Sequence, residues 1–191
     1  MTEDIIDYLN VLLSGTGFYS KNYCLCDFIY SAEEKRPAQY MTNGSFEEIN
    51  NFSSYSGVSY FRKSGKVRIS EVERKDIPSA CDEILVFSIP LKFISVVPKN
   101  KANADNAYTD EEIALKLFRF LNTSPNALKA SLNAISVNIR MTEYETDNSV
   151  ILREEYSNPK ISDFDYNYSY LSADIVCEVI IKQSCIKDPC S

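Results

Sequence analysis

Residues 109–122, TDEEIALKLFRFLN, decide the fold class of this 191-residue chain. Thr109 and Glu112 have the spacing of a capping box, which predicts that a helix begins here. The helix would have a wide apolar arc with a narrow polar stripe, and such an arc is typical of a helix that packs against a sheet. We expect three of its side chains to be buried against that sheet: Leu117, Phe120 and Leu121.

Strand patterns lie on both sides of this helix. Alternation and aromatic or β-branched residues predict strands at residues 23–30, 67–72, 83–97, 135–144, 150–156 and 166–183. Pro90 cannot donate to a central ladder, so residues 83–97 form a bulged strand, an edge strand or two consecutive strands. A change of phase at Tyr170 and Leu171 predicts a bulge.

Two more helices are predicted, at residues 2–14 and 125–131. The first has an apolar stripe, acidic residues at its start and Gly15 at its end. The second follows a Ser-Pro pair that suits a helix N-terminus. Helices segregated from a largely antiparallel sheet make an α+β fold, which we expect as one domain over residues 1–191 with the helices packed on one face.

Residues 31–66 show no clear periodicity and are predicted to be an insertion, either a β-hairpin or an extended arm. As an arm, the segment would dock on a neighbouring subunit through its aromatic side chains, because these bury a large area with few rotors to freeze. The candidate interface residues are Tyr40, Phe46, Phe52, Tyr55, Tyr60 and Phe61.

The composition points away from the common enzyme classes. The chain has no histidine, which excludes Ser-His-Asp triads, Cys-His pairs and histidine metal ligands, and none of its five glycines forms a phosphate-binding loop. Adjacent carboxylates such as Glu154 and Glu155 diverge in a strand or a helix and make no catalytic pair. The net charge of −7, without a basic patch, argues against nucleic acid as the main partner. We therefore expect no enzyme and no cofactor.

The cysteines are the nearest approach to a metal signal. Cys24 and Cys26 are expected on one strand face, and four thiolates, those of Cys24, Cys26, Cys185 and Cys190, would suffice for zinc. Free cysteine is, however, among the most buried residue types, so we expect reduced, metal-free thiols. A Cys185–Cys190 disulfide would require oxidising surroundings. Asp163 and Asp165 lack the rest of a calcium loop.

The first residues are acidic and lack the basic region of a signal peptide. No stretch approaches the ~18 apolar residues of a membrane span. These features predict synthesis in a reducing cytoplasm and no membrane partner.

The order of elements resembles that of tailed-phage neck and tail-completion proteins, the tail-terminator and head–tail-joining group. The resemblance is carried by the helices TEDIIDYLNVLLSG and EEIALKLFRFLN and by the terminal FDYNYSYLSADIVCEVIIKQ, and no signature residue matches. It implies a virion structural protein, made in the host cytoplasm, that forms a homo-oligomeric ring around the DNA channel and contacts portal, neck or tail proteins. An acidic channel wall would repel phosphate and let DNA slide.

Two other interpretations remain open. One is a bacterial protein-binding or adaptor domain, without catalysis, that acts through its tyrosine-rich surfaces. The other is a histidine-free hydrolase or a small zinc protein. Native mass spectrometry would distinguish these interpretations. A phage neck protein would form a ring, an adaptor would be a monomer or dimer, and a zinc protein would carry bound zinc.

Overall fold

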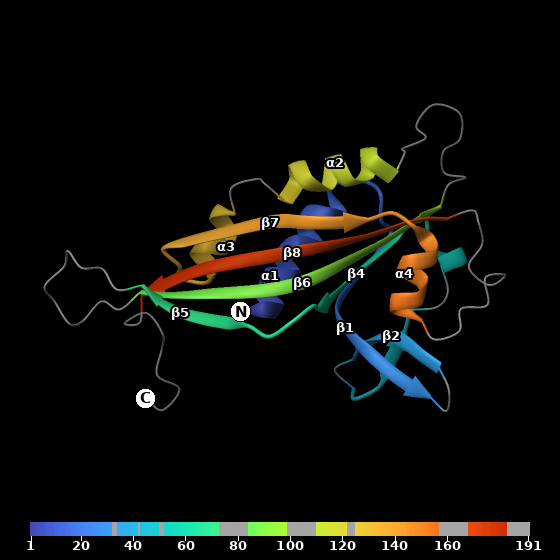
Figure 1. Ribbon diagram of the computed structural model, residues 1–191, viewed down its shortest axis with the longest axis horizontal. Helices are drawn as coiled ribbons and strands as arrows, with labels where there is room; N and C mark the ends of the chain where they lie inside the picture. The colour runs from blue at the N-terminus through green and yellow to red at the C-terminus, as the bar shows by residue number, and fades with distance from the viewer. Residues whose placement is uncertain are drawn as a thin grey trace, which may run out of the picture.

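The computed structural model describes residues 1–31, 34–41, 43–49, 52–72, 84–98, 110–121, 125–156 and 168–182, and it has the expected α+β class (Figure 1). The helices are α1 (Thr2–Ser14), α2 (Asp110–Leu121), α3 (Asn126–Ser131) and α4 (Asn148–Glu155), with a short 3-10 turn at Phe52–Ser54. The strands are β1 (Lys21–Ser31), β2 (Glu34–Tyr40), β3 (Phe46–Glu48), β4 (Val58–Lys63), β5 (Arg68–Val72), β6 (Ile84–Pro98), β7 (Ser136–Glu145) and β8 (Tyr168–Lys182).

The strands form one mixed, mostly antiparallel sheet. Its order is β3-β2-β1-β4-β6-β8-β7, with β5 also paired to β6. The long strands β6 and β8 pair along their whole length and form the centre, whereas β1 and β4 are parallel to each other. The strands β3 and β7 are the two edges of this order. Because α2 packs over β7 and β8, it lies towards the edge opposite β3.

Pro90 lies within the single strand β6, whose pairing with β8 runs through residue 90 without a shift, so neither a bulge nor a pair of consecutive strands is present and the edge alternative applies locally. On one edge of β6, β5 pairs with residues 84–88 and β4 with residues 91–96, which leaves Pro90 between the two partners. The Pro90 carbonyl accepts a bond from the Ser64 backbone N–H at this gap (3.3 Å). The backbone nitrogen and carbonyl of one strand residue point towards the same edge of the strand. The nitrogen of Pro90, which has no hydrogen to donate, therefore faces the gap between β5 and β4, where no strand needs a donor.

The face that we call the rear face carries α1, α2 and α3. Its apolar core, the rear core, includes Ile5, Leu9, Phe61, Phe93, Leu117, Ile139, Ile175 and Val179. Leu117 is buried here as expected, but Phe120 is only half-buried, and the Leu121 side chain lies outside the described residues. The expectation for Phe120 was therefore wrong in degree, because α2 turns only the side of Ile113, Ala114 and Leu117 towards the core.

The opposite, front face carries α4, where the sequence had predicted a strand. Its front core consists of Tyr23, Cys26, Ile49, Phe52, Val58, Tyr60, Ile94, Val96, Ile151, Leu152, Tyr156 and Tyr170. The helix begins at an N-cap, Asp147, whose carboxylate accepts the Ser149 backbone N–H at 2.8 Å. A helix of eight residues shows too few periods to be recognised, and Val150 and Ile151 favour a strand locally. Helices therefore cover both faces, not one.

The predicted bulge at Tyr170 and Leu171 is absent. The pairing of β8 with β6 runs through both residues without a shift, and Tyr170 lies in the front core while Leu171 lies in the rear core. The apolar alternation in the sequence changes phase here because both faces of the sheet are covered at this end of β8, so consecutive residues are apolar. The register shift lies in β7 instead, between Met141 and Glu143.

Residues 31–66 are part of the sheet in their described portions, as the hairpin interpretation predicted. They supply the end of β1, the strands β2, β3 and β4, and the 3-10 turn. Three of the six candidate interface residues, Phe52, Tyr60 and Phe61, are buried within the chain itself. Their assignment to an interface was wrong, because Tyr60 and Phe61 enter the cores on opposite faces of the sheet from β4, and Phe52 enters the front core from the 3-10 turn.

Candidate functional site

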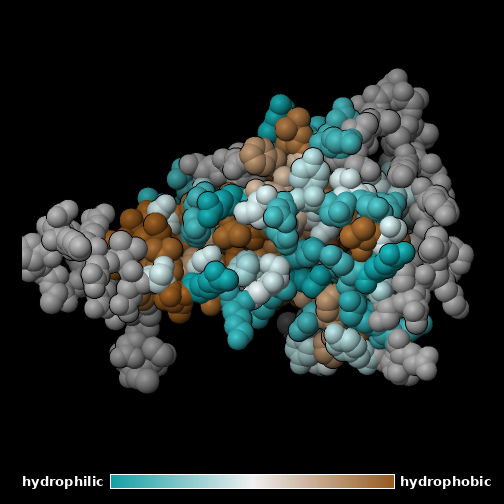
Figure 2. Space-filling view, in the orientation of Figure 1, coloured by the Kyte–Doolittle hydropathy of each residue, from teal (hydrophilic) through white to brown (hydrophobic). Residues whose placement is uncertain are grey.

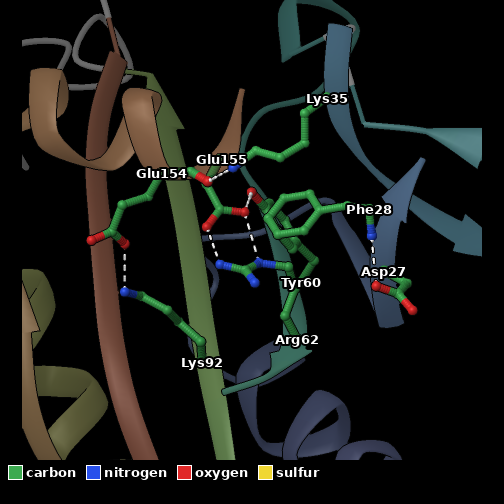
Figure 3. Close-up of polar contacts among 8 residues, drawn as sticks. All are labelled: Asp27, Phe28, Lys35, Tyr60, Arg62, Lys92, Glu154 and Glu155. Atoms are coloured by element: carbon green, nitrogen blue, oxygen red, sulfur yellow. Dashed lines mark hydrogen bonds and ion pairs between the residues drawn. The ribbon is translucent and has the colours of Figure 1, made fainter. Parts of the chain in front are cut away.

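The front core contains a buried carboxylate, Glu155, at the end of α4. It is 1% exposed and is the one charged residue among the buried described residues. Arg62 donates to both of its oxygens, from Nε to Oε2 at 2.9 Å and from Nη2 to Oε1 at 2.5 Å. The Tyr60 hydroxyl donates to Oε2 at 2.9 Å (Figure 3). This bidentate pair with a third donor satisfies the carboxylate where water is excluded.

The Arg62 guanidinium also stacks on an aromatic ring. Its central carbon lies 4.3 Å from the ring centroid of Phe28, and the Lys35 ammonium lies 4.4 Å from the same centroid. Figure 3 shows the Phe28 ring between the two cations, with Lys35 reaching from β2 and Arg62 from β4. Such cation–π contacts offset the loss of hydration of a charge that is held away from water.

The end of α4 is attached to several strands by polar contacts. Lys35 donates to the Glu154 backbone carbonyl at 2.5 Å, and Lys92 of β6 pairs with the Glu154 carboxylate at 2.5 Å. The Tyr156 hydroxyl donates to the Ile49 carbonyl at 2.7 Å, just after β3. Cations at the C-terminus also suit the helix dipole. Through α4, these contacts connect the small outer strands to the centre of the sheet.

The ionisable groups of this cluster serve one another within the chain. Burial, and then the adjacent Glu155 carboxylate, raise the pKa of Tyr60 well above its usual value, so the hydroxyl keeps its proton and donates. Both oxygens of Glu155 are engaged by donors from within the chain, which takes this carboxylate out of consideration as a general base for a substrate.

A pocket of about 220 Å³ lies where β1 passes between β2 and β4. We call it the tip pocket; it is lined by Leu25, Cys26, Asp27, Tyr40, Phe46, Arg62 and Lys63. The strand order places the β1 residues as its floor, Tyr40 and Phe46 on one side, and Arg62 and Lys63 on the other. Its walls combine aromatic surface with one exposed cation, Lys63, and one exposed anion, Asp27.

The aromatic wall stands on a tight hairpin. Tyr40 and Phe46 are cross-strand partners with ring centroids 5.3 Å apart in an edge-to-face arrangement. Between them, Gly44 has a φ of +83°, and the Asn43 side chain accepts the Ser45 backbone N–H at 3.0 Å. The Asn-Gly pair is a strong hairpin signal that the sequence analysis missed, and it would have located β2 and β3.

The six candidate interface residues thus divide into two groups. Tyr40 and Phe46 are 62% and 53% exposed and lie together at the tip pocket. Phe52, Tyr60 and Phe61 are buried, and Tyr55 is partly buried against the front core. Of the six, only Tyr40 and Phe46 are largely exposed to solvent.

The structure separates Cys24 from Cys26. A register shift between β1 and β4 lies between Asn22 and Leu25, so Cys24 packs against the rear core and Cys26 lies in the front core. The expectation that they share a face was therefore wrong. Burial raises the pKa of both thiols, and it raises that of Cys177 to about 12.

Within the described ranges, no three cysteine or carboxylate side chains gather closely enough to hold a metal ion. Cys185, Cys190, Asp163 and Asp165 lie outside those ranges. The zinc and calcium interpretations of these four residues are therefore not addressed by the described part of the chain.

No protein-family model and no curated protein sequence matches this chain. Among the described helices, none is both long enough and apolar enough to cross a membrane.

Proposed function

We propose that this protein is a structural component that works by protein–protein contact, as a homo-oligomeric ring in the neck or tail of a tailed phage. The observation that carries the proposal is the exposed Tyr40–Phe46 pair at the tip pocket. Two large aromatic side chains that face each other across the paired strands β2 and β3, beside a pocket, are typical of a contact site, because aromatic anchors in pockets dominate binding energy.

The order of elements supports the more specific part of the proposal. The helices α1 and α2 and the long terminal strand β8 have the places that the likeness to neck and tail-completion proteins implies. The strand predicted at residues 150–156, before β8, is instead the helix α4, so the support comes from α1, α2 and β8. In this proposal the protein is made in the host cytoplasm and its partners are further copies of itself and portal, neck or tail proteins.

Native mass spectrometry of the full chain tests the proposal. We expect a closed homo-oligomer with one dominant stoichiometry, and negative-stain images that show a ring. Replacing Tyr40 and Phe46 together by Ser should shift the population towards monomer, because the contact loses its aromatic anchors. Tyr30→Ser is the matched control, since Tyr30 is 76% exposed and is not among the residues that line the tip pocket.

A wild-type chain that stays monomeric at high concentration, and also with portal and tail proteins present, would overturn the ring. Binding of the monomer to an unrelated protein would then favour the adaptor interpretation. Neighbouring genes that encode portal and capsid proteins are the expected context, and their absence would remove the phage assignment.

A further inference from the structure

The helix α2 has a second apolar surface that the fold of a single chain does not use. Its inner side enters the rear core through Ile113, Ala114 and Leu117. On its outer side Leu115 and Phe118 remain 50% and 45% exposed. They are three positions apart and therefore adjacent on the helix surface. We call this pair the α2 patch; apolar atoms are visible on the outer side of α2 in Figure 2.

We propose that the α2 patch of one copy occupies the tip pocket of the next copy. This inference rests on the proposed function and names the two surfaces that meet in its assembly. The pocket, at about 220 Å³, is smaller than the ~300–1,000 Å³ of typical small-molecule sites, so its size suits one protein side chain. Phe118 fills it, with its ring against the Tyr40–Phe46 wall, in the arrangement that aromatic side chains prefer.

The charges at the two surfaces are complementary. Beside the tip pocket stand an exposed cation, Lys63, and an exposed anion, Asp27. Beside the α2 patch stand an exposed anion, Glu111, one turn before Leu115, and an exposed cation, Arg119, next to Phe118. Opposite signs in this arrangement set the register of a contact and disfavour wrong partners.

The positions of the two surfaces explain why the occupant is another copy. The residues that line the pocket come from β1, β2, β3 and β4 on one side of the sheet. The helix α2 packs over β7 and β8 on the other side (Figure 1). One chain therefore cannot bring its own patch to its own pocket. Contacts between different surfaces of identical copies are head-to-tail, and they close into a ring when the rotation permits.

Charge reversal in the full chain tests the pairing, measured by sedimentation velocity. Lys63→Glu and Glu111→Lys should each weaken association by roughly tenfold, and the double variant should recover most of that loss, because the pair is restored with its signs exchanged. Phe118→Asp should leave monomer. Val11→Asp, on an exposed position of α1 that is 73% accessible, should leave the oligomer unchanged. All the substituted residues are exposed, and circular dichroism verifies folding.

A crosslinker locates the contact directly. The photoreactive p-benzoylphenylalanine at position 118, in a mixture of isotope-labelled and unlabelled chains, should form intermolecular crosslinks to peptides that contain Tyr40, Phe46 or Lys63. If the chain assembles but these crosslinks are absent and Phe118→Asp still assembles, the inference fails while the proposed function stands. If the wild type does not assemble, the proposed function fails as well.

Discussion

The two faces of the sheet are stabilised in different ways. The rear core is apolar and lies under three helices, and its polar group Tyr19 makes a neutral hydrogen bond to Ser95 (2.8 Å). Of the described α-helices, only α4 covers the front core, which contains a buried carboxylate with an arginine and a tyrosine on its oxygens. The free energy gained by burying apolar area depends little on exact geometry, whereas a buried charge is stable only when all its hydrogen-bonding partners are in place.

The difference shows which parts of the molecule tolerate change. In the rear core, a substitution costs the lost area and the cavity that remains, and each site contributes nearly independently when sites are far apart. In the front core the partners are 93 and 95 residues apart in the chain, and removing one leaves the others unsatisfied. We therefore expect additive effects on the rear face and strong coupling on the front face.

The largest expected effect is at the rear. Phe93 is buried, with its ring centroid 5.1 Å from that of Phe61 and 6.2 Å from that of Tyr19. Phe93→Ala should lower the free energy of unfolding by about 3–5 kcal/mol, because it removes buried area and leaves a cavity. Denaturant unfolding followed by fluorescence measures it. A loss below ~1 kcal/mol, the scale of a surface substitution, would mean that this is not the main core.

The next effect tests coupling at the front. Glu155→Leu leaves the Arg62 guanidinium without its carboxylate and should cost about 3 kcal/mol, in the range for breaking a buried ion pair. Combining it with Arg62→Met should bring stability back towards the wild type, since neither charge is then buried. Unfolding of the two single variants and the double variant gives the coupling energy. Simple additivity would contradict the difference between the faces.

A smaller effect compares two tyrosine hydroxyls, one on each face. Tyr60→Phe removes a bond to a carboxylate and should cost about 2 kcal/mol, within the range for hydrogen bonds to charged groups. Tyr19→Phe removes a bond to a neutral serine and should cost about 1 kcal/mol. Both rings are buried and lose the same atom, so each variant is the control for the other. Equal losses would show that the charge at Glu155 does not matter.

The smallest effect concerns acid and the start of α4. Hydrogen bonds from the Ser149 side chain and backbone lower the pKa of Asp147 below its usual 3.8. The stabilisation from this cap is therefore complete above the ordinary carboxyl pKa and is lost as the pH falls through the lowered value. We expect the amide resonances of α4 to shift in that range. Asp147→Asn, which still caps but does not titrate, should abolish this pH dependence, and its persistence would assign it to another group.

The sequence alone determined the rear half of the fold. Its elements follow local patterns: the capping box of α2, the apolar stripe of α1 and the alternation of β6, β7 and β8. Each pattern indicates which side of its element is apolar. An apolar stripe needs only another apolar surface, so its periodicity is sufficient to place Leu117 or Ile139 in a core. The sequence also named the exposed Tyr40 and Phe46, although only as two of six aromatic candidates, and the Asn43-Gly44 signal that marks their hairpin was missed.

Only the tertiary structure decided the front half. The sequence around α4 favours a strand by local propensity, and the local cap at Asp147 is not enough to reveal a helix. The contacts that hold its end, from Glu155 to Arg62 and Tyr60, come from the distant strand β4. Likewise, nothing local separates Cys24 from Cys26; the register of β1 against β4 does so. Pairing between residues far apart in the chain has no period along the sequence, so composition and alternation contain no trace of it.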